Sequence, residues 1–460
     1  MSPMHERRRP DLRLGDRLSL TIDHLGDGGD GLARLDDYVV IVPGTLPGEQ
    51  VFATITSAGR KHGRAHLLRV EQPSRHRVAP ACPHFLACGG CDLQHLDYAR
   101  QLRHKQDQLQ RLLAYRLGDT APTVAPTIAP PDPWHRRNKV VLHFGQDFDG
   151  HAFAGFHRAR SIELVPIERC PTSDDEALRL GIDAADLLLD LHLPPWSERR
   201  PDGLLRSVMV RMTTLGEAHL LVVAAHDHVP GLRELLPALH RAGATTIALN
   251  VNPEEPARLL GPQTTILSGP PRIRERIDGV DYLLSPTAFF QTSPDGARTL
   301  VRLVAEFLAP ERDDVVADLY CGVGLFALAL AGKARDVLGC ERNPAAIADA
   351  MAAAAHGGIR NARFFAAAVH EWLRRCDDNL PRPQLVVLDP PRTGCEPEAL
   401  DELARLRPRK IAYVACDPQA LGRDLLALQE RGFGCSAVTP VDMFPHTAHI
   451  EAVACLLPTG

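Results

Sequence analysis

The chain has 460 residues, enough for two or three domains that each have their own core. Apolar residues make up 45% and charged residues 24%, which excludes a largely disordered protein. The formal net charge of −5 gives no evidence of nucleic-acid binding, so any such evidence must come from local clusters of basic residues. No apolar run approaches the roughly 20 residues that span a bilayer. The basic residues at the start are not followed by the apolar segment that a signal peptide requires. We therefore expect a cytoplasmic protein with no membrane partner.

The first 285 residues predict two domains. Residues 13–70 contain short apolar stretches separated by Gly- and Pro-containing turns, which predicts a small all-β barrel in a domain 1–72. A Cys/His/Gly-rich stretch follows, then an amphipathic helix within 94–117 and a linker rich in Pro and Thr. Strand-like and helical patterns mix from there on, so we expect residues 73–285 to form a mixed α+β central domain.

The last 175 residues, 286–460, change character. Nearly continuous apolar runs such as DVVADL, QLVVLD and KIAYVA alternate with helical stretches. Strands of this kind separated by helices are typical of a mostly parallel sheet covered by helices on both faces. The sequence therefore predicts a Rossmann-like α/β domain.

Three strand ends in this domain predict a cofactor site. The run VVADLYCGVG ends in a turn in which Gly322 and Gly324 let the backbone pass close to a ligand. Glu341 lies 21 residues after Tyr320, where an acidic side chain accepts hydrogen bonds from ribose hydroxyls. Asp389 leaves a third strand beside two prolines. The third glycine of a dinucleotide motif is missing, so a nucleoside-type ligand such as S-adenosylmethionine fits better than a nicotinamide cofactor.

Two reactive side chains follow at later strand ends. Cys416 comes directly after the apolar run KIAYVA, and Glu451 begins the final strand. A thiolate and a carboxylate at neighbouring strand ends suit covalent catalysis, in which the thiolate adds to the substrate and the carboxylate removes a proton. Cys395 is the rival nucleophile, and the remaining C-terminal cysteines are expected to be structural.

The C-terminal third resembles the RNA uracil-C5 methyltransferase family. The matching signatures are SPTAFFQTS, DLYCGVG, LDPPR, YVACDPQALGRDL and MFPHTAHIEAV. The resemblance implies that S-adenosylmethionine is contacted by four residues: Gln291, Tyr320, Glu341 and Asp389. It also implies that Cys416 attacks C6 of the uracil and that Glu451 abstracts the C5 proton. Phe289, in the first signature, is expected to stack on a flipped-out base.

These roles agree with the chemistry of uracil. C5 is a poor nucleophile until a group adds to C6, and a thiolate can both add there and leave again. Two positions depart from the family pattern, since Ser293 and Leu325 stand where many members have Asn. Neither position is in the predicted reaction, but both bear on the cofactor contacts and the subfamily.

Four further cysteines predict a metal centre. Cys82, Cys88 and Cys91 are crowded together, with Cys170 downstream, and four thiols suit either zinc or an iron–sulfur cluster. The spacing is not that of paired zinc knuckles. The region CPHFLACGGCDLQH with ERC at 168–170 resembles the iron–sulfur region of the family's ribosomal-RNA members, which favours a four-iron four-sulfur cluster over zinc.

The predicted partner is structured RNA. The N-terminal barrel resembles the TRAM domain, a small RNA-binding module, on LGDGGDGLARLDDYVVIVPGTLPGE. Basic residues gather at 60–77, and Trp134 stands beside cations at 134–139. The architecture resembles the ribosomal-RNA enzymes, so 23S rRNA is the expected substrate of a monomeric enzyme. Transfer RNA remains the alternative substrate, and a catalytically silent RNA-binding iron–sulfur protein remains the alternative function.

Overall fold

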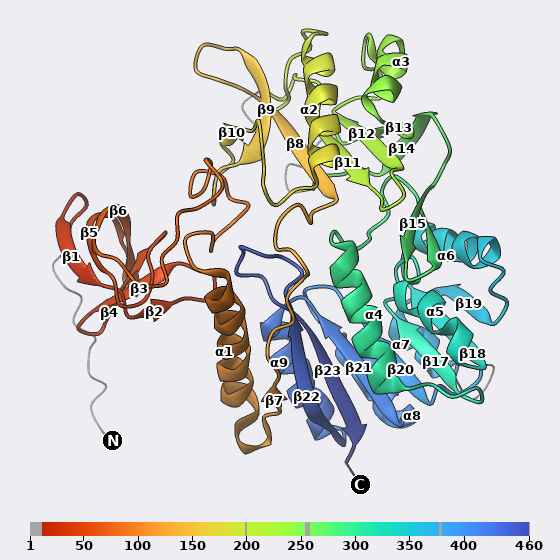
Figure 1. Cartoon of the computed structure of the whole chain (residues 1–460). Helices are drawn as coiled ribbons and strands as arrows, with labels where there is room; N and C mark the ends of the chain where they lie inside the picture. Colours follow the sequence, from red (N-terminus) through yellow and green to blue (C-terminus); the bar gives the residue numbers. More distant parts are fainter. Residues whose placement is uncertain (1–11, 198–199, 254–257, 377–379, 460) are drawn as a thin grey trace. The chain divides into compact units, whose positions relative to one another are not determined.

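A computed structural model describes residues 12–197, 200–253, 258–376 and 380–459 (Figure 1). These residues divide into two compact units. The first unit contains the residues up to Gln108 together with His157–Val165 and His446–His449. The second unit contains Leu109–Phe156, Pro166–Pro445 and the residues from Ile450 onward. Each unit is described separately below.

The first unit begins with a six-stranded sheet. Its strands are β1 (Arg17–Thr21), β2 (His24–Leu25), β3 (Gly31–Leu35), β4 (Tyr38–Val42), β5 (Gln50–Ala58) and β6 (His62–Gln72). Their order in the sheet is β1-β5-β6-β4-β3-β2. β1 also contacts β3, near the opposite edge, as expected of a sheet that curls round on itself. Alternate residues, such as Val40 and Val42 on β4, are buried in one apolar core.

The cysteine-rich segment also belongs to the first unit. Leu93 and Leu96 pack with two leucines of the β-domain in a small apolar cluster. The backbone N–H groups of Asp92 and Leu93 both donate to the carbonyl of His446, at 2.9 Å. The expected single central domain 73–285 is therefore divided, because residues 73–108 cluster with the β-domain and most of 109–285 belong to the second unit.

The helix expected within 94–117 is α1 (Tyr98–Leu117), whose first half belongs to the first unit and whose second half belongs to the second. It is followed by the short helix η1 (Gly118–Thr120). In the second unit, Leu109, Leu113 and Leu117 are one helical turn apart and enter the core of the C-terminal domain. The strand β10 (Leu164–Pro166) lies at the boundary between the two units.

A mixed sheet with helices α2 and α3 forms the N-terminal part of the second unit. Its elements are β8 (Lys139–Gln146), β9 (Ala152–His157), α2 (Asp175–Leu189), β11 (Leu205–Met212), β12 (Ala218–Ala224), α3 (Leu232–Ala242), β13 (Thr246–Val251) and β14 (Gln263–Ser268). The order is β9-β8-β11-β12-β13-β14. α2 begins at the N-cap Asp174, and it packs on β8 and β11. The opposite face of β11 carries Arg211, which is fully buried.

The C-terminal domain opens with the hairpin β15 (Ile273–Ile277) and β16 (Val280–Leu284). An alternating series of strands and helices follows: α4 (Pro294–Leu308), β17 (Val315–Leu319), α5 (Leu325–Leu330), η2 (Ala331–Lys333), β18 (Asp336–Glu341), α6 (Pro344–His356), β19 (Ala362–Ala366), α7 (Val369–Arg374), β20 (Leu385–Leu388), α8 (Pro397–Leu406), β21 (Lys410–Ala415), α9 (Pro418–Glu430), β22 (Phe433–Val441) and β23 (Glu451–Pro458).

These strands form one sheet in the order β19-β18-β17-β20-β21-β23-β22-β7. The pairs from β19 to β21 are parallel, whereas β23 is antiparallel to both of its neighbours. One face packs with α7, α8 and α9 and the other with α4, α5 and α6, as Figure 1 shows. Because both faces are covered, the strands carry nearly continuous apolar runs. The predicted Rossmann-like domain is confirmed.

The Pro- and Thr-rich linker is more ordered than expected. Thr123 and Val124 form a short strand, β7, that pairs in parallel with β22 at the edge of the C-terminal sheet. Further on, Ile128 makes an isolated parallel bridge to Val441. The prolines supply no N–H, so an edge position, where only one side of the strand is paired, is where such a segment can join a sheet.

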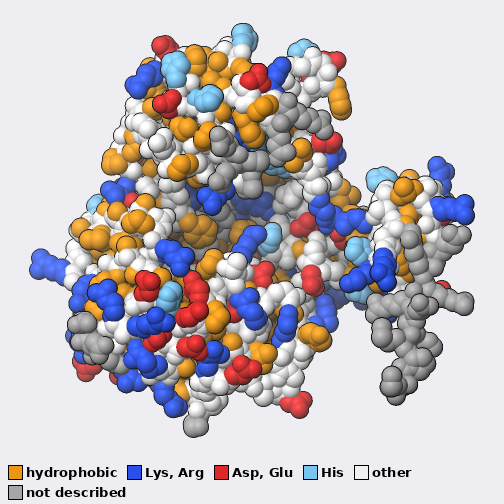
Figure 2. Space-filling view, turned by 180° about the vertical axis from the view of Figure 1, so that it is seen from behind, with side chains coloured by type: hydrophobic (Ala, Val, Ile, Leu, Met, Phe, Trp, Pro, Cys, Tyr) orange, Lys and Arg blue, Asp and Glu red, His pale blue; other side chains and the backbone are white. Residues whose placement is uncertain are grey.

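The surface of the second unit is of mixed charge. Figure 2 shows Lys/Arg and Asp/Glu side chains interspersed over its lower part, on the face seen from behind. This mixture agrees with the small net charge of the chain. RNA binding on this face would therefore depend on individual side chains and not on a field of one sign.

Candidate active site

Four predicted site residues lie at one edge of the C-terminal sheet. Leu319 is paired with Cys340 on one side and with Leu388 on the other. Tyr320 directly follows Leu319, Asp389 directly follows Leu388, and Glu341 is the last residue of β18. The carboxyl ends of parallel strands meet at the same edge, which is where open α/β sheets bind ligands. The structure therefore brings these three side chains to one edge, and Cys416, after β21, to the same edge.

The turn after β17 has the backbone shape that a nucleoside ligand needs. Gly322 and Gly324 have φ of +54° and +86°, and a Cβ on Gly322 would meet no atom within 4 Å. One Glu341 carboxylate oxygen accepts the Gly322 N–H at 3.3 Å, and the other accepts the Asn343 N–H at 2.8 Å. Tyr320 has a φ of +61°, and its hydroxyl donates to the Glu396 carboxylate. Open glycine backbone beside a fixed carboxylate fits S-adenosylmethionine.

Gln291 and Phe289 are carried by the segment between β16 and α4. Gln291 is buried, whereas Phe289 is 71% exposed between two buried neighbours, Ala288 and Phe290. An exposed aromatic ring held between two buried residues is suited to stacking on a base. Ser293, the departure from the family pattern, is the N-cap of α4 and accepts the Gly296 N–H. Ser293 therefore has a local structural function.

The predicted nucleophile and the predicted base lie opposite each other at the ends of two adjacent strands. Ala415 on β21 pairs with Ala452 on β23, so the next step in this antiparallel register places Cys416 opposite Glu451. Burial, with smaller contributions from the Glu451 and Asp389 carboxylates, raises the pKa of Cys416 to about 11. Burial raises the pKa of Glu451 to about 8, with a smaller contribution from Asp389. The two groups are therefore electrostatically coupled at the edge that carries the cofactor residues.

Arg392 is a member of this group that was not singled out from the sequence. Its positive charge lowers the pKa of both Cys416 and Glu451, against the larger effect of burial. It therefore favours the two ionised forms that covalent catalysis requires. Its position in LDPPR, three residues after Asp389, was the available signal, but that motif was interpreted only through the aspartate and the prolines.

The rival cysteine lies in a different environment. Cys395 is 7% exposed and belongs to the apolar core of the domain. Its thiol lies 3.9 Å from the Tyr413 hydroxyl, its N–H donates to Asp424 at 2.8 Å, and burial raises its pKa strongly. These contacts favour Cys416 over Cys395.

Three of the four predicted metal ligands lie in the first unit. Cys82, Cys88 and Cys91 are half-buried in a segment of tight turns, where the Cys88 N–H donates to the His84 carbonyl at 2.8 Å. Half-buried thiols on turns suit a cluster, because thiolates are the ligands that iron–sulfur centres use. Cys170 belongs to the second unit. Burial raises the pKa of its thiol, but hydrogen bonds from Ser173 and Thr172 outweigh burial and lower it overall.

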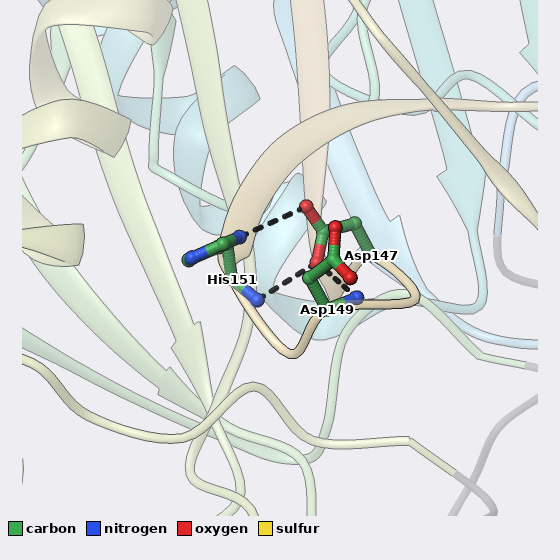
Figure 3. Close-up of side chains that lie close together, drawn as sticks. All are labelled: Asp147, Asp149 and His151. Carbon is green, nitrogen blue, oxygen red and sulfur yellow. Dashed lines mark hydrogen bonds and ion pairs between the residues drawn. The ribbon is translucent and has the colours of Figure 1, made fainter.

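One exposed group of metal-type side chains has a simpler explanation. Among the described residues, Asp147, Asp149 and His151, on the hairpin between β8 and β9, are the one group whose ligand atoms lie within 4.8 Å of one another (Figure 3). The Asp147 carboxylate accepts the backbone N–H groups of Asp149 and His151, at 3.0 and 2.8 Å. It also approaches the His151 ring at 3.3 Å. An aspartate that caps its own turn accounts for this arrangement without a metal.

The sheet order, the glycine turn and the acidic strand ends define an S-adenosylmethionine-dependent methyltransferase. Comparison with known proteins narrows the class. A family model described as tRNA (Uracil-5-)-methyltransferase matches residues 277–458, and one for the TRAM domain matches residues 12–68. In the part of the chain that the structure describes, no helix is long and apolar enough to cross a membrane.

Whole-chain relatives agree with these matches. The chain is 34% identical to an RNA methyltransferase of Halalkalibacterium halodurans, over 96% of this chain and 97% of that protein. It is 35% identical to one of Gloeobacter violaceus, over 96% of both. A crystal structure of Pyrococcus abyssi tRNA (uracil-54, C5)-methyltransferase with S-adenosyl-L-homocysteine matches with a TM-score of 0.75 and 28% identity, covering 95% of this chain and 99% of that one. The chain belongs to the RNA uracil-C5 methyltransferase family, and it is an S-adenosylmethionine-dependent enzyme.

Proposed function

We propose that this enzyme makes 5-methyluridine in 23S rRNA, with Cys416 as the nucleophile and Glu451 as the base. The observation that carries the catalytic part is the register of β21 and β23, which places Cys416 opposite Glu451 beside Asp389. Both side chains can then act on one pyrimidine ring, one at C6 and the other at C5.

The proposed reaction follows from the positions of these groups. The Cys416 thiolate adds to C6 of the uracil, and the resulting electron density at C5 forms the bond to the methyl group. Bound S-adenosylmethionine would supply that methyl group, its S–CH3 bond breaking to leave S-adenosylhomocysteine, and Gln291, Tyr320, Glu341 and Asp389 would hold it. The Glu451 carboxylate then takes the proton from C5. The electrons of that C–H bond restore the C5–C6 double bond and expel the Cys416 thiolate.

Arg392 contributes to this scheme through its charge. Burial leaves Cys416 and Glu451 largely protonated near pH 7, whereas addition to C6 uses the Cys416 thiolate and the later proton removal uses the Glu451 carboxylate. The neighbouring Arg392 guanidinium shifts both groups toward the ionised form, because its positive charge stabilises their negative charges. Phe289 would stack on the flipped base, since its ring is exposed on the segment that also carries Gln291.

The choice of RNA depends on the cysteine-rich segment. Its resemblance to the iron–sulfur region of ribosomal-RNA enzymes supports 23S rRNA as the substrate of a monomeric, cytoplasmic enzyme. Transfer RNA is the second candidate, because the Pyrococcus abyssi enzyme, which matches over nearly the whole chain, is a tRNA methyltransferase.

Mapping of 5-methyluridine separates the two substrates. We expect RNA from a strain that lacks this gene to lose 5-methyluridine at one or two positions of 23S rRNA and to keep it in tRNA. A plasmid copy should restore the modification, and a copy carrying Cys416→Ala should not. Loss confined to tRNA would overturn the ribosomal assignment, and no loss in either RNA would support a silent RNA-binding protein.

The four cysteines Cys82, Cys88, Cys91 and Cys170 are proposed to hold a four-iron four-sulfur cluster. Protein purified without oxygen should contain about four iron atoms and four acid-labile sulfides per chain and absorb visible light. Cys88→Ser should lose most of the iron, whereas Cys435→Ser, which alters a cysteine of the C-terminal sheet, should retain it. One equivalent of zinc without visible absorption would contradict the cluster.

A further inference from the structure

One buried arginine binds the segment that carries Phe289 and Gln291. Arg211, on β11, is 2% exposed. Its guanidinium donates to the carbonyl oxygens of Ala288 and Phe290, at 3.2 and 3.4 Å. The two bonds therefore fall on either side of Phe289, whose ring is 71% exposed. A planar guanidinium can span two carbonyls in this way because its donors are fixed in a fork.

Neighbouring residues complete this attachment. The backbone N–H of Asn138 donates to the carbonyl of Thr292 at 3.0 Å. The guanidinium of Arg136 pairs with Asp295 in the first turn of α4. Carbonyls at three alternate positions, 288, 290 and 292, are thus bound by β11 and by the residues just before β8. The two side chains between them, at 289 and 291, are those assigned to the base and to the cofactor.

The cost of burying Arg211 indicates that it has a specific task. A buried charge is unfavourable unless it is compensated. Here the Glu275 carboxylate on β15 favours the charged guanidinium, while Lys139 and His219, opposite Arg211 on the adjacent strands, carry no compensating negative charge. Among the residues that the structure describes, the hydrogen bonds of the guanidinium go to the 288–290 backbone and not to a carboxylate. An apolar residue would fill the same space without this cost. We therefore infer that the guanidinium is needed to bind the 288–290 carbonyls.

We propose that Arg211 is a positioning residue that holds residues 288–292 in the conformation that presents Phe289 to the RNA and Gln291 to the cofactor. This inference rests on the proposed roles of those two residues. Arg211 is buried and would act through this segment, without contacting substrate or cofactor itself. Its loss should weaken binding more than it slows the methyl-transfer step.

Arg211→Lys is the informative substitution, because lysine keeps the charge but cannot span two carbonyls with a rigid fork. We expect the KM for RNA and the Kd for S-adenosylhomocysteine to rise about tenfold, with kcat within threefold of the wild-type value. The backbone amides of residues 285–293 should exchange hydrogen for deuterium faster. Arg211→Met should show the same changes to a larger extent if it folds.

Arg206→Lys is the matched control. Arg206 lies on the same strand, stacks 3.6 Å from the Trp196 ring and donates to the Asn252 carbonyl at 2.8 Å. Its described contacts are with Trp196 and with the residue that follows β13, whereas those of Arg211 are with the 288–290 backbone. Arg206→Lys should leave hydrogen exchange in 285–293 and both binding constants unchanged. Equal changes in the two variants would mean that Arg211 stabilises only the sheet, and would overturn the proposal.

A double-mutant cycle tests the route of the effect. If Arg211 acts through Phe289, then Arg211→Lys should add little to the KM for RNA once Phe289→Ala is present. Fully additive effects would overturn the proposal, as would unchanged exchange in 285–293. The hydrogen–deuterium exchange measurement does not depend on methyltransferase activity. If Phe289→Ala and Gln291→Ala alone have no effect on binding, their assigned roles fail, while exchange still decides whether Arg211 holds the segment.

Discussion

Cys416→Ala should lower kcat by roughly 10⁴-fold or more, while the Kd for S-adenosylhomocysteine stays within about threefold of the wild-type value. The reason is that C5 of uracil becomes nucleophilic only after addition at C6, and no other thiol lies opposite Glu451 in the register of β21 and β23. The thiol acts on the base and not on the methyl donor, so cofactor binding should persist. Single-turnover methylation with labelled S-adenosylmethionine and titration calorimetry measure the two quantities.

Cys395→Ala is the control for this prediction. Cys395 is buried in the core, so its replacement should cost roughly 1 kcal/mol of unfolding free energy and leave kcat largely intact. Substantial turnover by Cys416→Ala would contradict the assignment. If Cys395→Ala were the inactive variant instead, Cys395 would become the nucleophile.

Glu451→Gln should stop the reaction after methyl transfer and accumulate a covalent complex of enzyme and methylated RNA. Addition of Cys416 to C6 and formation of the C5–methyl bond do not require Glu451, whereas elimination does. Glutamine has nearly the shape of glutamate but cannot accept the C5 proton. The adduct should appear as a slowly migrating band on a denaturing gel, carrying both protein and labelled methyl groups.

Two controls define this result. Wild-type enzyme should form the same band on RNA containing 5-fluorouridine, because fluorine replaces the departing proton. Glu402→Gln, which alters a glutamate of α8 that pairs with Arg374 on α7 and with Arg405 on α8, should turn over normally and form no band. A folded Glu451→Gln enzyme that binds RNA but is inactive and forms no adduct would contradict Glu451 as the base. His449 would then be the next candidate.

Much of the fold and the candidate site residues could be predicted from local sequence. The strand LVVL is apolar throughout, and VVADL is apolar except for Asp318, because helices cover both faces of the sheet; that pattern is visible without a structure. Tyr320, Glu341, Asp389 and Cys416 each follow or end such a run, and parallel strands bring their carboxyl ends together whatever the details of packing. The signal for these residues is contained within a few positions of each one.

Other features depended on contacts between distant residues. Arg211 binds carbonyls 77 and 79 positions away, and nothing near Arg211 in the sequence indicates which backbone its side chain reaches. The linker pairs with β22 through Thr123 and Val124, although its prolines are typical of an unpaired segment. The charge of Arg392 matters only because folding places it near Cys416 and Glu451.

The sequence by itself therefore determined which strand ends carry reactive groups, because strand pattern and strand-end chemistry are local properties. Only the tertiary structure decided that Cys416 stands opposite Glu451, because strand register is set by packing across the whole sheet. It likewise decided that the segment presenting Phe289 is held by Arg211 from a separate sheet, since a buried charge is oriented by distant backbone groups that become its partners only on folding.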